Sequence, residues 1–323
     1  MDRLESMAVL VAAAEAGSLS AAARRLGMPL ATASRKVSDL ERHLKTRLFV
    51  RSSRRLTLTD SGRTYLAACR RILEQVEEAE RSAAGEYRTP RGELTLTAPI
   101  VFGRLHVLPI ILQFLRDYPD IRVRLVQTDR IVDLIEEHAD LALRIGELPD
   151  SSLVATRVSA VRRVVCGSPA YFAARGAPQR PEEIATHDCI SFEGLTSPDE
   201  WTFRIGKADR VFPIRSRLVV NTAEAAIDAA IAGLGVVHVL SYQIADAVRA
   251  GRLALVLEDF EPSPWSVSLV YSGQPQLPVK LRAFLDFAAP RLRSRLERLK
   301  RHPGPKASGN QSTKAKRSTS KSP

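Results

Sequence analysis

Residues 16–44 read AGSLSAAARRLGMPLATASRKVSDLERHL, and this stretch decides the fold of the N-terminal end. Gly17 ends a helix that the apolar spacing predicts over 3–16, and Gly27 ends a second, short helix. Pro29 suits the first turn of a third helix. Two helices joined by a glycine turn, the second with a polar N-terminal face, form the helix-turn-helix pattern.

The third helix has one apolar stripe, because Ala33, Val37, Leu40 and Leu44 recur at helical spacing. Its opposite face is polar and includes Arg35. In a helix-turn-helix the second helix enters the major groove N-terminus first, where arginine can bridge two guanine acceptors and serine or threonine can serve several bases. The alternative is an ordinary three-helix bundle whose charges are only solvated.

Two short strands are predicted next, over 48–51 and 56–59, around a basic and polar tip. We interpret them as a wing that reaches the DNA backbone or the minor groove. The candidate DNA-contacting residues are Ser20, Leu30, Ala31, Thr32, Ser34 and Arg35 on the helices and Arg51, Ser53, Arg54 and Arg55 on the wing.

Several segments of this region match one protein family. They are Met1 to Met7, Ala16 to Gly27, Ser34 to Glu41, and Arg47 to Thr59 with Gly62 beyond. Through these segments, residues 1–85 resemble the DNA-binding domain of LysR-type transcriptional regulators. The chain departs from the family at Pro29-Leu-Ala-Thr, where many members have a Ser-Gln-Pro-Ala type of start, and this departure bears on base contacts at Leu30 and Ala31.

A long helix is predicted over 60–84, followed by a hinge-like linker. Its apolar residues follow a near-3.5 spacing: Leu66, Cys69, Leu73 and Val76. That spacing indicates that the helix pairs with another helix, so we expect a homodimer or homotetramer. A two-fold protein predicts a matching symmetry in its double-stranded DNA site, an interrupted inverted repeat.

The composition sets limits on the class of protein. The chain of 323 residues is 45% hydrophobic, a normal globular value, and is long for a single core. No stretch approaches the ~20 apolar residues of a membrane span, and no export signal precedes residue 20, so no membrane is expected. The three cysteines are odd in number and widely spaced, which argues against disulfides and predicts a reducing, cytoplasmic location.

The net charge of +12 lies at the two ends of the chain. Residues 1–60 carry +5 and residues 291–323 carry +10, while the remainder carries −3. A basic folded end suggests a nucleic acid partner, although solubility alone would account for the same charge. Residues 301–323 are predicted to be a disordered basic tail that either adds non-specific DNA attraction or is inert.

From Glu93 strands and helices alternate. The first region has strands over 94–97, 121–127 and 140–145 and helices over 103–118 and 131–138. The second has strands over 161–166, 189–192, 211–220 and 236–240 and helices over 169–174 and 223–232. Strands over 253–257 and 266–271 and a helix over 280–299 follow. This order predicts parallel sheets with helices on both faces.

The family resemblance extends to about residue 295, through Ala98 to Arg104, Asp140 to Gly146, Ser168 to Tyr171, His187 to Ile190 and Gly233 to Gly235. It implies a two-lobed effector domain like the periplasmic binding proteins of type 2. The expected fold class is therefore α/β with a largely α-helical N-terminal module, a winged helix-turn-helix. The expected domains are a DNA-binding domain over 1–59, a dimerisation helix and hinge over 60–90, and an effector domain over 91–300. Its lobe one would span 91–160 and 267–299, and its lobe two 161–266.

The effector cleft is expected outside the carboxyl ends of the strands. The candidate effector-binding residues are Ala98, Pro99, Ile100, Phe102, Gln127, Thr128, Ile145, Gly146, Phe192 and Asn221. A helix N-terminus follows Asn221 and attracts anions, so we expect a small organic anion as effector. A plain N-cap is the simpler interpretation of Asn221 itself.

Other motifs indicate no catalytic site, no cofactor and no metal. Gly233-x-Gly235 follows a helix and precedes a strand, the reverse of a nucleotide fingerprint. His187 and Cys189 are expected to be structural, and a redox switch of Cys166 with Cys189 stays open. The alternatives to an effector-controlled regulator are a two-lobed enzyme tethered to DNA and a constitutive architectural protein.

Overall fold

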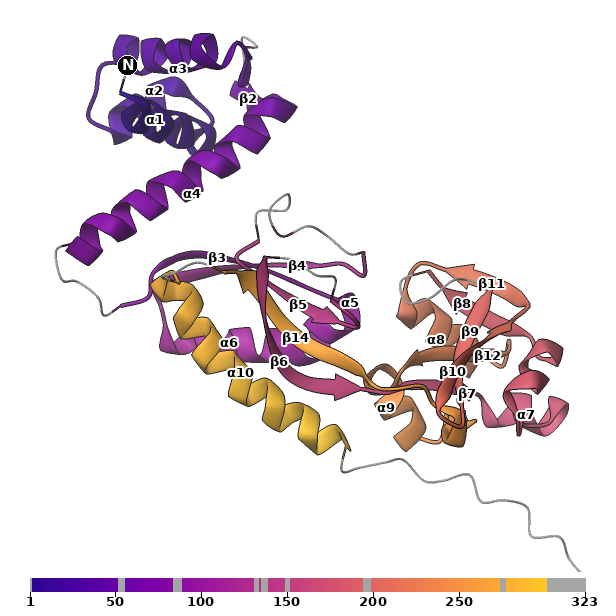
Figure 1. Ribbon diagram of the computed structural model, residues 1–323. Helices are drawn as coiled ribbons and strands as arrows, with labels where there is room; N and C mark the ends of the chain where they lie inside the picture. The colour runs from indigo at the N-terminus through magenta and orange to yellow at the C-terminus, as the bar shows by residue number, and fades with distance from the viewer. Residues whose placement is uncertain are drawn as a thin grey trace, which may run out of the picture.

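The computed structural model describes residues 2–51, 56–83, 89–130, 134, 139–148, 152–193, 199–273 and 277–300 (Figure 1). The N-terminal module begins with the three predicted helices, α1 (Arg3–Ala16), α2 (Leu19–Arg25) and α3 (Leu30–Leu44). Their buried faces share one core, to which α3 contributes Ala33, Val37 and Leu40 as its spacing predicted.

The ends of these helices follow from local chemistry. The Ser18 side chain accepts a hydrogen bond from the Ala21 amide and caps α2. Gly17 ends α1 in the left-handed region at φ 65°, where a Cβ would be strained. Lys45 takes a similar conformation at φ 52° and ends α3. The chain therefore turns sharply at both positions.

The wing and the long helix complete the module. Strands β1 (Phe49–Arg51) and β2 (Leu56–Leu58) pair antiparallel, as predicted, and α4 (Asp60–Ala83) follows. Leu66 and Cys69 of α4 are buried in the core of their own module, and Leu73 packs against it. The N-terminal part of the apolar seam is thus covered within the chain and does not require a second helix.

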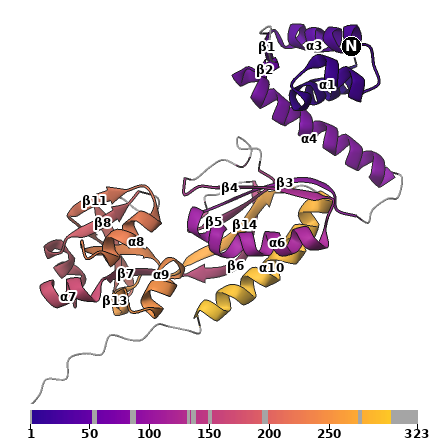
Figure 2. The same cartoon turned by 180° about the vertical axis from the view of Figure 1, so that it is seen from behind.

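Lobe one is built on a five-stranded sheet in the order β4-β3-β5-β14-β6. Its strands are β3 (Gly92–Ala98), β4 (Ile121–Gln127), β5 (Leu141–Ile145), β6 (Leu153–Val161) and β14 (Trp265–Ser272). A continuous helix runs through α5 (Ile100–Phe102), a π-helical segment η1 (Gly103–Val107) and α6 (Leu108–Asp117). Together with α10 (Val279–Lys300) it packs against the sheet (Figure 2).

Lobe two has a second five-stranded sheet in the order β11-β8-β12-β7-β13. The strands are β7 (Arg163–Gly167), β8 (Cys189–Phe192), β11 (Ser216–Val220), β12 (Val236–Leu240) and β13 (Ala254–Val256). The helices are α7 (Pro169–Arg175), α8 (Ala223–Ile231) and α9 (Ser241–Arg249), with 3-10 turns η2 (Pro181–Thr186) and η3 (Glu258–Phe260). A hairpin of β9 (Glu200–Ile205) and β10 (Ala208–Pro213) packs on one face through Trp201 and Phe203.

Two predictions about the sheets are wrong. The sheets are mixed rather than parallel: β14 runs antiparallel to β5 and β6, and β7 runs antiparallel to β12 and β13. The chain crosses between the lobes along β6 and returns along β14, which imposes these directions (Figure 1). The strand predicted over 211–220 is two strands, because it breaks after Pro213, which has no N–H for a ladder.

Some elements were not predicted from the sequence. They are β6, the β9–β10 hairpin and α9, and the long helix of lobe one begins at Ile100, earlier than predicted. The helix predicted over 131–138 and the tail over 301–323 lie outside the described residues, apart from Leu134, which is buried.

A buried lysine joins α4 to lobe one. The Lys280 ammonium, at the start of α10, donates to Glu74 Oε2 of α4 at 2.7 Å and to the carbonyl of Glu93. Asp140 Oδ1 lies 3.8 Å away, and only 7% of the Lys280 side chain is exposed. The N-terminal module and lobe one are therefore in contact through charged side chains.

Among the described residues, no single helix has the length and apolar composition of a membrane span, and α1 and α2 pass that test only together, as a pair bent by 118°.

Candidate nucleic-acid interface and effector cleft

The first turn and a half of α3 presents side chains to solvent, beside its buried stripe at Leu30 and opposite it at Ala31 and Arg35. Leu30 is 51% exposed, Ala31 and Arg35 are exposed, and Thr32 and Ser34 are half-buried. Pro29 is the N-cap and makes no side-chain hydrogen bond, so the main-chain amides of this turn rely on its carbonyl alone, which accepts from Thr32 and Ala33. Ser20 of α2 is also exposed, and its hydroxyl lies 3.1 Å from that of Ser18.

The rest of α3 is held rigidly by the module. Lys36 pairs with Glu5 of α1. Glu41 accepts hydrogen bonds from the amides of Leu48 and Phe49 at 2.9 and 3.2 Å, which fixes the start of the wing to the helix. A recognition helix needs such support, because base contacts depend on its position in the groove.

The described part of the wing consists of its two strands. Val50 pairs with Thr57 across the ladder, which leaves residues 52–55 as the connection. The predicted contacts Ser53, Arg54 and Arg55 and the side chain of Arg51 lie outside the described residues.

The effector candidates of lobe one gather where its parallel strands end. Gln127, the last residue of β4, is exposed and Thr128 after it is half-buried, while Pro99 and Ile100 are half-buried after β3. Ile145 ends β5, and a Cβ on Gly146 would lie 3.8 Å from the Trp265 ring. Ala98 and Phe102 are 1% and 0% exposed, so these two side chains present no surface to a ligand in this structure.

The two candidates from lobe two differ in burial. Phe192 is 5% exposed, while Asn221 is exposed. The N-cap of α8 is Thr222, whose hydroxyl accepts from the Ala225 amide at 3.3 Å. The interpretation of Asn221 as a plain N-cap is therefore wrong, because the next residue, Thr222, is the cap.

Two residues that the sequence analysis missed, Tyr242 and Glu224, connect the lobes, and a third, Asp129, lies within lobe one. Tyr242 of α9 packs edge-on against Phe102 with ring centroids 5.1 Å apart. Glu224, in the first turn of α8, lies 3.5 Å from Arg104 of lobe one. Asp129 accepts a hydrogen bond from the Ile100 amide at 3.1 Å. Asp129 follows the candidates Gln127 and Thr128 directly and could have been found there, whereas Tyr242 lies on a helix that was not predicted.

The two crossovers between the lobes are tied by an ion pair. Arg162, between β6 and β7, donates to both carboxylate oxygens of Glu261 at 3.0 and 3.2 Å. Burial raises the pKa of Glu261 to about 7 although Arg162 opposes that rise. Beside this pair, the Arg163 guanidinium lies 4.5 Å from the centre of the Trp265 ring.

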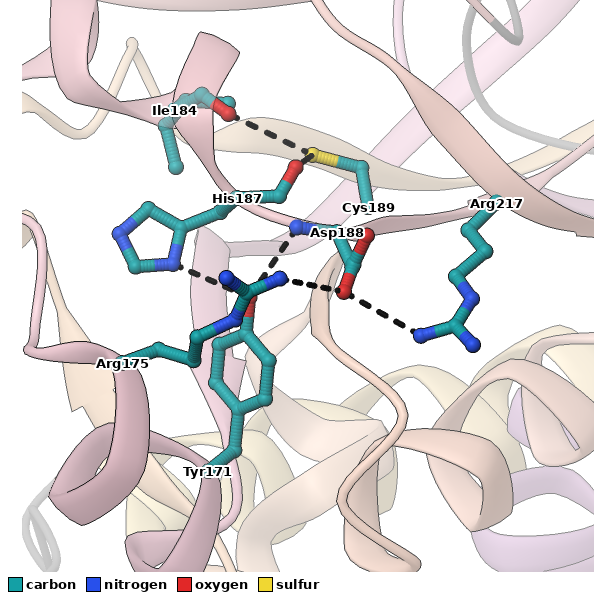
Figure 3. A network of polar contacts seen from close by, with 7 residues as sticks. All are labelled: Tyr171, Arg175, Ile184, His187, Asp188, Cys189 and Arg217. Atoms are coloured by element: carbon teal, nitrogen blue, oxygen red, sulfur yellow. Dashed lines mark hydrogen bonds and ion pairs between the residues drawn. The ribbon is translucent and has the colours of Figure 1, made fainter.

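The His187-Asp188-Cys189 run belongs to a polar network in lobe two (Figure 3). The Tyr171 hydroxyl lies 3.1 Å from His187 Nδ1 and accepts from the Asp188 amide at 3.0 Å. Asp188 also pairs with Arg175 and Arg217, at 3.2 and 3.3 Å. The network joins α7, β8 and β11, which is the structural role expected from the sequence.

Cys166 and Cys189 do not face each other. In the ladder Cys166 pairs with Val237 and Cys189 with Val236, and adjacent residues of β12 point to opposite faces. Burial raises the pKa of both thiols, that of Cys189 to about 12. A disulfide between them is excluded in this fold. Among the described residues, no group of three His, Cys, Asp or Glu side chains could hold a metal ion.

Comparison with known proteins settles the family. Residues 4–63 match the domain described as a bacterial regulatory helix-turn-helix protein of the lysR family, and residues 88–293 match the LysR substrate binding domain. The chain belongs to the LysR family of transcriptional regulators. This regulator therefore combines a helix-turn-helix DNA-binding domain with an effector-binding domain.

The relatives that are similar to this LysR-type regulator include both a repressor and an activator. An HTH-type transcriptional repressor of Pseudomonas aeruginosa is 34% identical over 289 residues, 89% of this chain and 91% of its own length. The transcriptional activator AaeR of Escherichia coli is 30% identical over 289 residues, 88% of this chain and 93% of its own. The solved structure of CrgA from Neisseria meningitidis, a LysR-type regulator, has a TM-score of 0.58 at 31% identity and covers 89% of this chain and 98% of its own.

Proposed function

We propose that the first turn of α3 reads base edges in the major groove while the wing contacts the DNA backbone. The observation that carries this proposal is the exposure of Leu30, Ala31 and Arg35 on the face of α3 that the core leaves free. Arg35 would supply the hydrogen bonds and Leu30 an apolar contact, since Pro29 and Ala31 offer no polar side chain.

The test is a gel-shift titration of the Ser34→Ala, Arg35→Ala double variant with its operator. We expect specific binding to weaken by about 1–3 kcal/mol, the value of a good base contact. Arg249→Ala is the matched control, because Arg249 is exposed on α9 and pairs with Asp246. Unchanged operator affinity in the double variant would refute this role of α3.

We also propose that a small organic effector binds between the two lobes, at the strand ends that carry Thr128 and Asn221. The two crossovers form a hinge, and a ligand can change DNA affinity only if it favours one arrangement of the lobes. Thr128→Trp and Asn221→Trp should abolish the ligand response and leave operator binding intact. Ala98→Trp is a poor test, because Ala98 is 1% exposed and the ring would disrupt the core.

The measurement is operator affinity and reporter output with and without candidate metabolites. Arg116→Trp, on α6, serves as the control for a bulky substitution at a helix end of the same domain. If the Thr128→Trp and Asn221→Trp proteins respond like the parent, the effector lies elsewhere.

We further propose that this regulator acts in the cytoplasm as a homo-oligomer on an interrupted inverted repeat. Leu108 and Leu112, one helical turn apart on α6, are 38% and 53% exposed and offer an apolar surface to a second copy. Ile72 of α4, beside the apolar seam, is 37% exposed and offers another.

A further inference from the structure

The helix that begins lobe one receives its cap from a distant loop. Pro99 makes no side-chain hydrogen bond at this N-terminus, and the Ile100 amide donates instead to Asp129 Oδ1 at 3.1 Å. The helix continues from Ile100 to Asp117. Because the first amides of a helix are where an anion binds, the Asp129 carboxylate occupies the place that an anionic ligand would take.

The second oxygen of this carboxylate is left without a donor. Asp129 Oδ2 is buried and accepts no hydrogen bond from the part of the chain that the structure describes. Burial raises the pKa of Asp129, and the nearby charge of Glu224 raises it further against the effect of the Ile100 amide. A buried acceptor of this kind is stabilised by any ligand that brings a donor to it.

Lobe two adds two more groups to the same place. Tyr242 is 5% exposed, and its hydroxyl is buried. Its ring packs edge-on against Phe102, two residues along the helix from Ile100, whose amide binds Asp129. Burial and the charges of Asp129 and Glu224 raise the pKa of Tyr242. Glu224 itself stands in the first turn of α8 and faces Arg104.

The electrostatics of this cluster oppose an anionic effector. The helix N-terminus at α5 already binds a carboxylate of the chain, Asp129, and Glu224 lies in the first turn of α8 beside Arg104. A second carboxylate would meet the like charge of Asp129 there, whereas an ammonium group would meet the opposite charge of Asp129 and its acceptor oxygen Oδ2. The rings of Phe102 and Tyr242 pack edge to face at 5.1 Å and are both buried, and the half-buried Pro99 and Ile100 add apolar surface at the same helix N-terminus.

We propose that Asp129, Glu224 and Tyr242 form the polar end of the effector site and select small molecules that carry an ammonium group on an aromatic or apolar body. The proposal rests on the proposed effector binding between the lobes and replaces the expectation of an organic anion. Asp129 Oδ2 and the Tyr242 hydroxyl oxygen accept hydrogen bonds from the ammonium group, and Glu224 supplies further negative charge.

The test compares two probes that share a phenylethyl body, phenethylamine and 3-phenylpropionate, by calorimetry with the full chain. We expect the amine to bind at least tenfold more tightly than the acid. Asp129→Asn retains an oxygen for the Ile100 amide and removes the charge, and it should weaken amine binding at least tenfold. Asp228→Asn, the same change at an exposed position of α8, should have no effect.

Two further variants protect the test against a folding defect. Glu224→Gln, at a side chain that is 37% exposed, should weaken amine binding several-fold, and Tyr242→Phe should do the same. Tighter binding of the acid, no binding of the amine, or unchanged amine binding in Asp129→Asn and Glu224→Gln would each overturn the selection of ammonium groups. The Thr128→Trp and Asn221→Trp responses report separately on whether the cleft is the effector site at all.

Discussion

The buried side chain of His238 contributes a pH-dependent term to the stability of the effector domain. His238 stacks on Phe203 at 5.9 Å and lies 5.4 Å from Trp201, and burial together with the charge of Arg163 lowers its pKa to about 3. An unfolded histidine has a pKa of about 6.5. As the pH falls, the unfolded state therefore binds a proton before the folded state does. The stabilisation that the folded state gains from neutral His238 is complete above pH ~6.5 and is lost as the pH falls towards 3.

The predicted consequence is a decline in unfolding free energy of up to about 1.4 kcal/mol per pH unit below pH ~6.5 from this group. His238→Phe keeps an aromatic ring and should make the decline shallower. Urea unfolding followed by tryptophan fluorescence measures it, since Trp201 and Trp265 are the two tryptophans of the chain. His43→Gln, at an exposed position, should retain the parental slope. Equal slopes for the parent and His238→Phe would contradict the argument.

At the scale of elements, the docking of α4 onto the wing depends on one glycine. A Cβ on Gly62 would lie 2.0 Å from the Leu48 carbonyl oxygen, which belongs to backbone and cannot rotate away. Gly62→Ala should therefore destabilise the N-terminal module by about 1–3 kcal/mol, as overpacking does. A thermal melt of the full chain checks this, with Ser61→Ala at the neighbouring exposed position as control. Similar melting temperatures of Gly62→Ala and Ser61→Ala would show that α4 can shift away from Leu48 without loss of stability.

The elements that could be predicted from the sequence are those with a local signal. Glycine stops and apolar stripes of period 3.6 predicted α1, α2 and α3, and the strands of lobe one that alternate with helices were found where expected. Strand direction could not be predicted from such local signals, because β6 and β14 pair with each other although they lie far apart along the chain. The same holds for the site: Thr128 and Asn221 follow strand ends, whereas Tyr242 reaches Phe102 only through tertiary packing.

At the scale of the whole molecule, the Lys280–Glu74 ion pair joins segments 206 residues apart. Glu74→Gln should loosen α4 from lobe one while Lys280 keeps Asp140 and the Glu93 carbonyl. We expect amide exchange in α4 peptides around this position to rise about fivefold, equivalent to ~1 kcal/mol, with no change in α3. Glu80→Gln, an exposed position on the same helix, is the control. Equal amide exchange rates of the α4 peptides in Glu74→Gln and Glu80→Gln would mean that the Lys280–Glu74 ion pair does not couple α4 to lobe one.

All three cysteines of the chain, Cys69, Cys166 and Cys189, are buried, and burial raises the pKa of each thiol, that of Cys69 to about 11. A thiolate is the species that reacts with maleimides and iodoacetamides, so the folded protein should not react with such reagents at neutral pH. A cysteine introduced on the surface of each lobe would then carry a spin label or fluorophore without prior removal of the native thiols. The distance between two such labels would follow the opening and closing of the lobes directly, in solution and on DNA.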